Sequence, residues 1–144
     1  MYLNKWLALS VGLTLGLSVL EHFGLLSKVL GMDGTGITFL ILAVFFLAHF
    51  VTLNLVFKFN EQVIENLWFV AESLIALGMI GTVVGFTMLF GDAFTHLNLE
   101  DTESVMAALS DIASGMGTAL ITTLVGLVTS LILKFELVFI VRTE

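Results

Sequence analysis

The sequence contains no cysteine and no proline, and only five of its 144 residues are Lys or Arg. Without cysteine, the chain forms no disulfide, thiolate metal site or cysteine nucleophile. Because proline is a common cause of helix kinks, its absence predicts straight helices in which any hinge is a glycine. The few basic residues and the net charge of −7 disfavour nucleic acid as a partner, because phosphate contacts need Lys and Arg.

Charged residues of either sign are also scarce. They make up 12% of the chain, against roughly 25% in soluble domains, and 58% of the residues are hydrophobic. The sequence therefore predicts an all-α integral membrane protein with no large soluble domain. It shows no nucleophile–base pair, no Gly-rich phosphate loop and no clustered metal ligands. We therefore expect no enzymatic activity, no metal and no cofactor.

Four apolar segments are candidates to cross a bilayer, which takes roughly 20 residues. We expect transmembrane helices at about residues 3–25, 37–57, 67–90 and 112–135. The first two form an N-terminal membrane hairpin within residues 1–66, which ends in a short connector at 58–66. The last two lie within residues 67–144 and flank an acidic loop at 92–111. Asp101 or Thr102 is expected to cap the last helix, which continues to about Val141 and so protrudes from the membrane.

The basic residues predict the orientation of these spans. One side of a four-span protein carries Lys5, Lys58, Lys134 and Arg142, and only Lys28 lies on the other. The positive-inside rule then places both termini in the cytoplasm and the acidic loop outside.

The third and fourth segments carry small residues where a lipid-facing helix would show Leu or Ile. Helical spacing puts Thr82 on one face of the third segment, and Thr122 and Thr123 on one face of the fourth. The small residues expected to pack around these threonines are Gly78, Gly81, Gly85, Ala119, Gly126 and Ser130. Small residues let helix backbones approach closely, and hydroxyls in a bilayer seek partners or water. The stripes therefore form the wall of an ion path, or they serve packing alone, with each Thr bonded to its own helix backbone.

Two motifs on these segments resemble a known family. GMIGTVVGF at 78–86 and TALITTLVGL at 118–127 resemble the last two membrane helices of the MotA/TolQ/ExbB proton-channel family, over about residues 70–135. The resemblance implies that Thr82 and Thr123 face a central pore. It also implies a homo-pentamer in the bacterial inner membrane around a single-span MotB/TolR/ExbD-like partner, whose membrane aspartate carries the proton. The implied function is a stator that couples proton or sodium flow to mechanical work.

The sequence departs from this family in three ways. Thr118 replaces a glutamate of the TolQ/ExbB branch, the family's prolines are missing, and the large cytoplasmic domain of flagellar stators is reduced to about 58–66.

Threonine hydroxyls do not titrate at physiological pH, but each offers one donor and two acceptor lone pairs to water or sodium. Glu72 lies ten residues from Thr82, about 15 Å along a helix, and Asp111 lies twelve residues from Thr123, about 18 Å. We expect these two carboxylates near opposite mouths of the path. A titratable group at the level of the threonines must then come from a partner.

Three alternatives stay open. His49 lies inside the second segment, where it is a proton relay or a hydrogen-bond partner of a neighbouring helix. The protein as a whole is alternatively a non-coupled, holin-like pore or a structural membrane protein. A small proton-coupled exporter is the third alternative, with Glu21 as its only candidate carboxylate.

Overall fold

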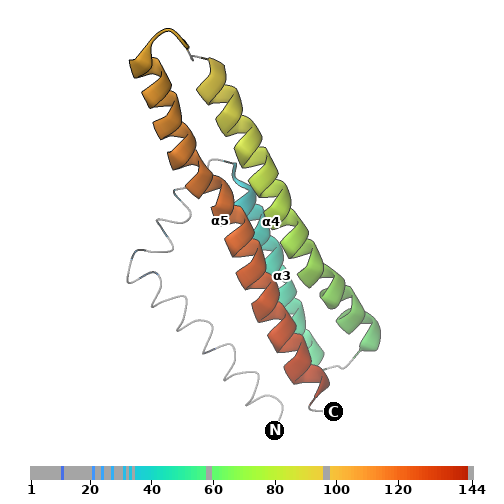
Figure 1. The fold of residues 1–144 in the computed structure, drawn as a ribbon. Coiled ribbons are helices and arrows are strands. Elements are labelled where there is room, and N and C mark those ends of the chain that lie inside the picture. Colours follow the sequence, from blue (N-terminus) through green and yellow to red (C-terminus); the bar gives the residue numbers. More distant parts are fainter. Residues whose placement is uncertain are drawn as a thin grey trace.

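The computed structural model describes residues 35–57, 60–95 and 98–142, together with Val11, Glu21, Gly24, Ser27, Gly31 and Asp33. It contains helices α3 (Ile37–Phe57), α4 (Glu61–Thr95) and α5 (Thr102–Val141), and no strand occurs among these residues. Figure 1 shows α4 and α5 as a long antiparallel hairpin, with α3 packed against the half that contains the start of α4 and the end of α5. The predicted span at 3–25 falls almost entirely outside the described residues.

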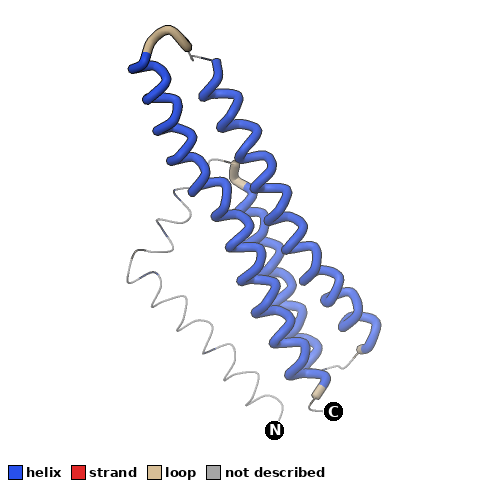
Figure 2. The backbone as a smooth tube through the Cα atoms, in the orientation of Figure 1, coloured by secondary structure: helices blue, strands red, loops and turns tan. Residues whose placement is uncertain are grey.

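Helices α4 and α5 are longer than the spans predicted at 67–90 and 112–135. Their 35 and 40 residues extend about 52 and 60 Å at ~1.5 Å per residue, whereas a bilayer core is about 30 Å thick. The last helix begins at Thr102 after the Asp101 cap and ends at Val141, as predicted, whereas α4 continues to Thr95, beyond the predicted span, so the acidic segment at 92–111 includes the end of α4 and the start of α5 (Figure 2). Hydropathy marks only the apolar part of a helix, and no proline stops these two at the membrane surface.

A capping residue fixes the start of α5. Asp101 has extended backbone angles, and its carboxylate accepts a hydrogen bond from the Glu103 backbone N–H at 3.1 Å. This interaction satisfies one of the backbone donors that every helix leaves unpaired at its first turn.

An aspartate also organises the start of α3. Asp33 Oδ1 accepts hydrogen bonds from the Thr35 N–H at 2.9 Å and the Thr35 hydroxyl at 2.6 Å, while Oδ2 accepts one from the Thr38 N–H at 2.7 Å. Gly36 has a φ of 72°, a left-handed conformation that favours glycine. Burial by itself raises the pKa of Asp33, but the hydrogen bonds from Thr35 and Thr38 outweigh it and lower the pKa below 3.8.

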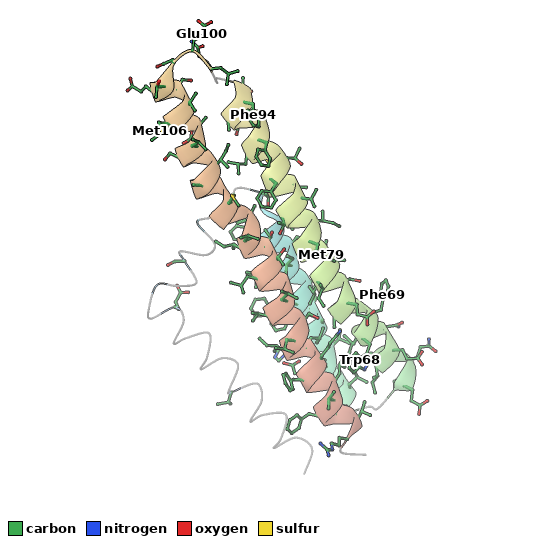
Figure 3. All side chains as sticks on the ribbon, viewed as in Figure 1. Trp68, Phe69, Met79, Phe94, Glu100 and Met106 are labelled. Carbon is green, nitrogen blue, oxygen red and sulfur yellow. The ribbon has the colours of Figure 1, made fainter. Side chains whose placement is uncertain are left out.

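Two of the described helices, α4 and α5, are long and apolar enough to cross a membrane, and α3 carries a shorter apolar stretch at Ile37–Thr52. Large apolar side chains cover the outer surface of the helices; Phe69 of α4 is 72% exposed and Met79 is 54% exposed (Figure 3). Such a surface needs lipid or protein against it. The number of spans in the whole chain, four, stays a prediction.

Bulky apolar residues hold α3 on the hairpin. Ile41 and Phe45 of α3 are buried in one cluster with Leu74 of α4 and with Leu133 and Leu137 of α5. The close packing of this cluster fixes the position of α3 beside the C-terminal half of α5.

Candidate functional site

Three threonine hydroxyls meet at the contact between α4 and α5. Thr82 projects from α4, and Thr122 and Thr123 project from consecutive positions on α5. The Thr82 and Thr123 Oγ1 atoms are in direct hydrogen-bond contact, and Thr122 Oγ1 lies 3.5 Å from Thr82 Oγ1. We call these three residues the threonine cluster.

The hydroxyls of the threonine cluster also converge on two backbone carbonyls. The Gly78 oxygen lies 3.2, 3.3 and 3.0 Å from the Oγ1 atoms of Thr82, Thr122 and Thr123. The Ala119 oxygen lies 3.0 Å from Thr82 Oγ1 and 2.9 Å from Thr122 Oγ1. Because a hydroxyl carries one proton, each threonine donates to one of these acceptors at a time and keeps lone pairs for further partners.

Glycines allow α4 to come this close to α5. A Cβ at Gly78 would lie 2.9 Å from the Thr122 carbonyl oxygen, and one at Gly81 would lie 2.7 Å from the Thr122 Cβ. A Cβ at Gly85 would lie 2.9 Å from the Ala119 Cβ. These distances are shorter than ordinary van der Waals contact, so a larger residue at any of the three glycines would push the helices apart.

The same face of α5 continues toward its C-terminal end through Gly126 and Ser130. A Cβ at Gly126 would lie 2.6 Å from the Leu74 carbonyl oxygen. Ser130 is 1% exposed, and its hydroxyl has no hydrogen-bond partner among the described residues. Buried hydroxyls are normally hydrogen-bonded to protein or water, so the Ser130 hydroxyl could form a hydrogen bond with one further group.

The members of the threonine cluster differ in access to the surface of the single chain. Thr122 is fully buried, with 0% of its surface exposed. Thr82 and Thr123 are half-buried, at the edge of the contact. Thr82 and Thr123 therefore keep part of their surface accessible to a neighbouring molecule, and Thr122 does not.

The two carboxylates expected at the mouths of an ion path lie on the outer surface of the hairpin. Glu72 of α4 and Asp111 of α5 are both exposed. They do not contact the threonine cluster, and α4 and α5 run antiparallel, so the two carboxylates lie on opposite sides of it along the hairpin.

A buried titratable pair lies elsewhere, between α3 and α5. His49 Nδ1 lies 2.9 Å from Glu136 Oε1, although the two residues are 87 positions apart. The Thr52 hydroxyl donates to the His49 carbonyl at 2.6 Å and lies 3.4 Å from Glu136 Oε2. Glu136 is 2% exposed, and the side chain of His49 is 14% exposed. We call His49 and Glu136 the histidine–glutamate pair; Thr52 lies beside it.

Glu136 was not among the residues predicted from the sequence to be functional. The predicted fourth span ends at residue 135, and no titratable group was expected on these helices at the level of the threonines. Glu136 is 13 residues beyond Thr123, about 20 Å along α5. It therefore lies nearer the C-terminal end of α5 than the threonines do, but still inside the packed bundle. The signal that could have found it is the rule that an ionisable residue inside an apolar run is a functional candidate, applied to LILKFELVFIV at 131–141.

The chain was compared with protein families, curated proteins and solved structures. No curated protein and no solved structure matches this chain. The model of the MotA/TolQ/ExbB proton channel family matches residues 51–139, which is more than half of the 144 residues and includes all of α4, nearly all of α5 and the threonine cluster. This membrane protein therefore belongs to the MotA/TolQ/ExbB proton channel family.

Proposed function

We propose that the chain is the ion-conducting membrane subunit of a stator-like complex, which couples proton or sodium flow to mechanical work on a partner protein. In this proposal several copies, five by analogy with the family, surround the membrane span of a partner that carries an aspartate. The complex lies in the bacterial inner membrane, with both termini of the chain in the cytoplasm.

The observation that carries the proposal is the pair of half-buried threonines, Thr82 and Thr123, at the edge of the α4–α5 contact. Both belong to the part of the chain that the family model matches. Small residues beside them, such as Gly78 and Gly81, keep bulky side chains away from the hydroxyls. A ring of such edges from several copies would line an otherwise apolar tunnel with oxygen atoms.

The chemistry of this tunnel follows from what a hydroxyl does. Thr82 and Thr123 donate to backbone carbonyls or to each other, so their oxygens accept hydrogen bonds from water or coordinate a sodium ion. They cannot store a proton themselves. The described residues place no carboxylate beside the threonine cluster, and an aspartate supplied by the partner would complete the path.

Ion flux into proteoliposomes tests the proposal. The full chain is reconstituted with its partner, and a pH-sensitive dye reports proton entry under an imposed gradient. Thr82→Val and Thr123→Val keep the side-chain shape and remove the hydroxyl. Losing about 1.4 kcal/mol of ion stabilisation, the order of one hydrogen bond, should slow flux about tenfold in each variant.

Thr87 provides the matched control. It lies on the same helix as Thr82, is exposed, and donates its hydroxyl back to the Val83 carbonyl at 2.8 Å. Thr87→Val should leave the flux unchanged. Wild-type flux in the Thr82→Val and Thr123→Val variants would rule out the role assigned to the hydroxyls.

A second function, that of a structural or non-coupled pore-forming membrane protein, is favoured by one observation. Every hydroxyl of the threonine cluster has a backbone acceptor within the single chain, as pure helix packing requires. Under this alternative, the Thr→Val variants lose stability but flux does not depend on the partner. Measuring flux with and without the partner separates the two functions.

A further inference from the structure

The end of the α4–α5 hairpin that carries the turn extends past the start of α3 (Figure 1). We call its described residues within 90–111 the hairpin tip. Among them, only Ala93 and Ala108 are buried. The large apolar side chains of Phe94 and Leu109 are instead 58% and 56% exposed. A hairpin that stood alone in water would bury its large apolar side chains before its small ones, so the outer surface of the tip is suited to a partner.

The two buried alanines lie where α4 and α5 face each other. Below them, Leu89 of α4 contacts Gly115 of α5 across this interface. Ala93 is one helical turn beyond Leu89, and Ala108 is two turns before Gly115. Both alanines therefore continue the line of contact between the two helices.

The exposed apolar residues lie together on one side of this line. Phe94 follows Ala93 by one position, and Leu109 follows Ala108 by one position, a rotation of about 100° in each case. In an antiparallel pair of helices, equal rotations from the line of contact lead to the same side of the hairpin. Phe90 extends this side, because its ring stacks on that of Phe94 with the centroids 6.0 Å apart. We call Phe90, Phe94 and Leu109 the apolar face of the tip.

The apolar face lies on the same side of the hairpin as the accessible threonines. Thr82 follows the buried Gly81 by one position, and Thr123 follows the buried Thr122 by one position. The same rotation from the line of contact therefore applies to both threonines. A molecule that lies along the threonine side of the hairpin reaches the apolar face when it continues toward the tip.

The apolar face lies beyond the hydrocarbon layer. Phe94 is 12 residues past Thr82, about 18 Å along α4, and Leu109 is 14 residues before Thr123, about 21 Å along α5. Thr123 is close to the middle of the span expected at 112–135. The hydrocarbon core reaches only about 15 Å from its middle. Lipid tails therefore do not cover the apolar face.

The charge of the tip selects what can cover this face. Residues 59–133 contain no Lys or Arg, and His96 of the tip lies outside the described residues. A second copy of the tip would bring like charges together, and anionic lipid head groups would be repelled in the same way. A protein segment with apolar and basic side chains meets both the apolar and the electrostatic requirement. The acidic residues of the tip are Asp92, Glu100, Asp101, Glu103 and Asp111.

We propose that the apolar face of the tip docks a segment of a partner protein that carries apolar side chains together with Lys or Arg. The apolar side chains pack on Phe90, Phe94 and Leu109, and the basic ones face the acidic residues of the tip. In the complex proposed above, this segment adjoins the membrane span of the partner, an assignment that rests on the proposed function. The docking chemistry itself does not depend on ion conduction.

Cysteine labelling of the full chain in phosphatidylcholine nanodiscs tests the docking face. Because the natural sequence has no cysteine, Leu109→Cys places a single thiol on the apolar face, and Phe94→Cys gives a second, independent position. Ser110→Cys is the matched control, since Ser110 is exposed at the same depth but turned a further 100° away from the face. The rate of reaction with a water-soluble maleimide is measured for each thiol.

The probe is a synthetic helical peptide with leucines on one face and lysines on the other. At about ten times its dissociation constant, it should slow the labelling of Leu109→Cys and Phe94→Cys about tenfold. Labelling of Ser110→Cys should change less than twofold under the same conditions. A peptide with glutamate in place of lysine should protect none of the three positions.

Three outcomes would overturn the proposal. Equal protection of all three cysteines would show adsorption of the peptide to lipid, and equal protection by both peptides would show that charge does not select the occupant. Slow labelling of Leu109→Cys and Phe94→Cys without any peptide would show that a second copy covers the face. The measurement uses neither the partner nor an ion gradient. Wild-type flux in Thr82→Val and Thr123→Val would therefore remove the proposed function without changing the labelling result.

Discussion

The two contacts that α5 makes are built on opposite principles. Against α4, it uses Gly126 and the threonine cluster, and the backbones approach so closely that carbonyls become the hydrogen-bond acceptors. Against α3, it uses large aliphatic side chains and one buried acid–base pair. At these residues the first contact contains no titratable side chain, and it is sensitive to the volume of one methyl group. The second is filled by large buried side chains and contains the His49–Glu136 pair.

The largest expected effect comes from removing one member of the His49–Glu136 pair. His49→Leu leaves Glu136 buried without its partner and should destabilise the protein by about 3–5 kcal/mol. His49→Leu combined with Glu136→Leu converts the interface to an apolar one and should recover most of this loss. Reversible unfolding in mixed micelles measures both. Equal losses in the single and double variants would show that the pair is not what couples α3 to α5.

The next largest effect is expected at the contact between α4 and α5, where a larger side chain would separate the helices. Gly126→Val places a side chain where a Cβ alone would lie 2.6 Å from the Leu74 carbonyl oxygen, so α4 and α5 must separate. We expect a loss of about 3 kcal/mol in the same unfolding measurement. Gly91→Val is the control, because a Cβ at Gly91 meets no atom within 4 Å. If both valines behave alike, the helices do not depend on close approach at this point.

A smaller effect distinguishes stability from conduction within the threonine cluster. Thr122 is fully buried and donates to a carbonyl, so Thr122→Val should reduce stability by about 1 kcal/mol, the value of one hydrogen bond. Its effect on ion flux should be smaller than that of Thr123→Val, because Thr123 is half-buried. A larger flux defect in Thr122→Val than in Thr123→Val would reverse this assignment.

The smallest effect concerns the start of α3. Hydrogen bonds lower the pKa of Asp33 in the folded chain, so its contribution to stability is present above the ordinary aspartate pKa and is lost as the pH falls through the lowered value. Asp33→Asn should remove this acid dependence at a cost of about 0.5 kcal/mol at neutral pH. Unfolding midpoints of the variant and wild type from about pH 5 to pH 2 measure the difference. An acid dependence that persists in the variant would assign it to other carboxylates.

Sequence patterns anticipate the local features of this fold better than its interfaces. The apolar run at 37–57 coincides with α3, and Asp101 caps α5 through its own side chain. Both features depend on residues that are close together in the sequence. The ends of α4 were not anticipated, because its polar flanks are as compatible with helix as its apolar centre and contain no proline. Hydropathy predicts where a helix meets lipid and not where it ends.

The residues that meet in the two interfaces could be identified fully only from the tertiary structure. The family motifs point to Thr82 and Thr123 as a pair, since each motif carries its own recognisable spacing. His49 and Glu136 are 87 residues apart in sequence, and nothing in either local pattern relates one to the other. Their contact follows from the parallel packing of α3 and α5, which pairs residues by depth in the bundle.

The shared acceptors of the threonine cluster affect the direction in which its hydrogen bonds run. Three hydroxyl protons serve two carbonyl oxygens and one another, so more than one donor pattern fits the same positions of the heavy atoms. The cluster can reverse the order of its donors by rotating O–H bonds, with no movement of either helix. In the ion path proposed above, a wall with this property would reset after each passage while both helices stay in place.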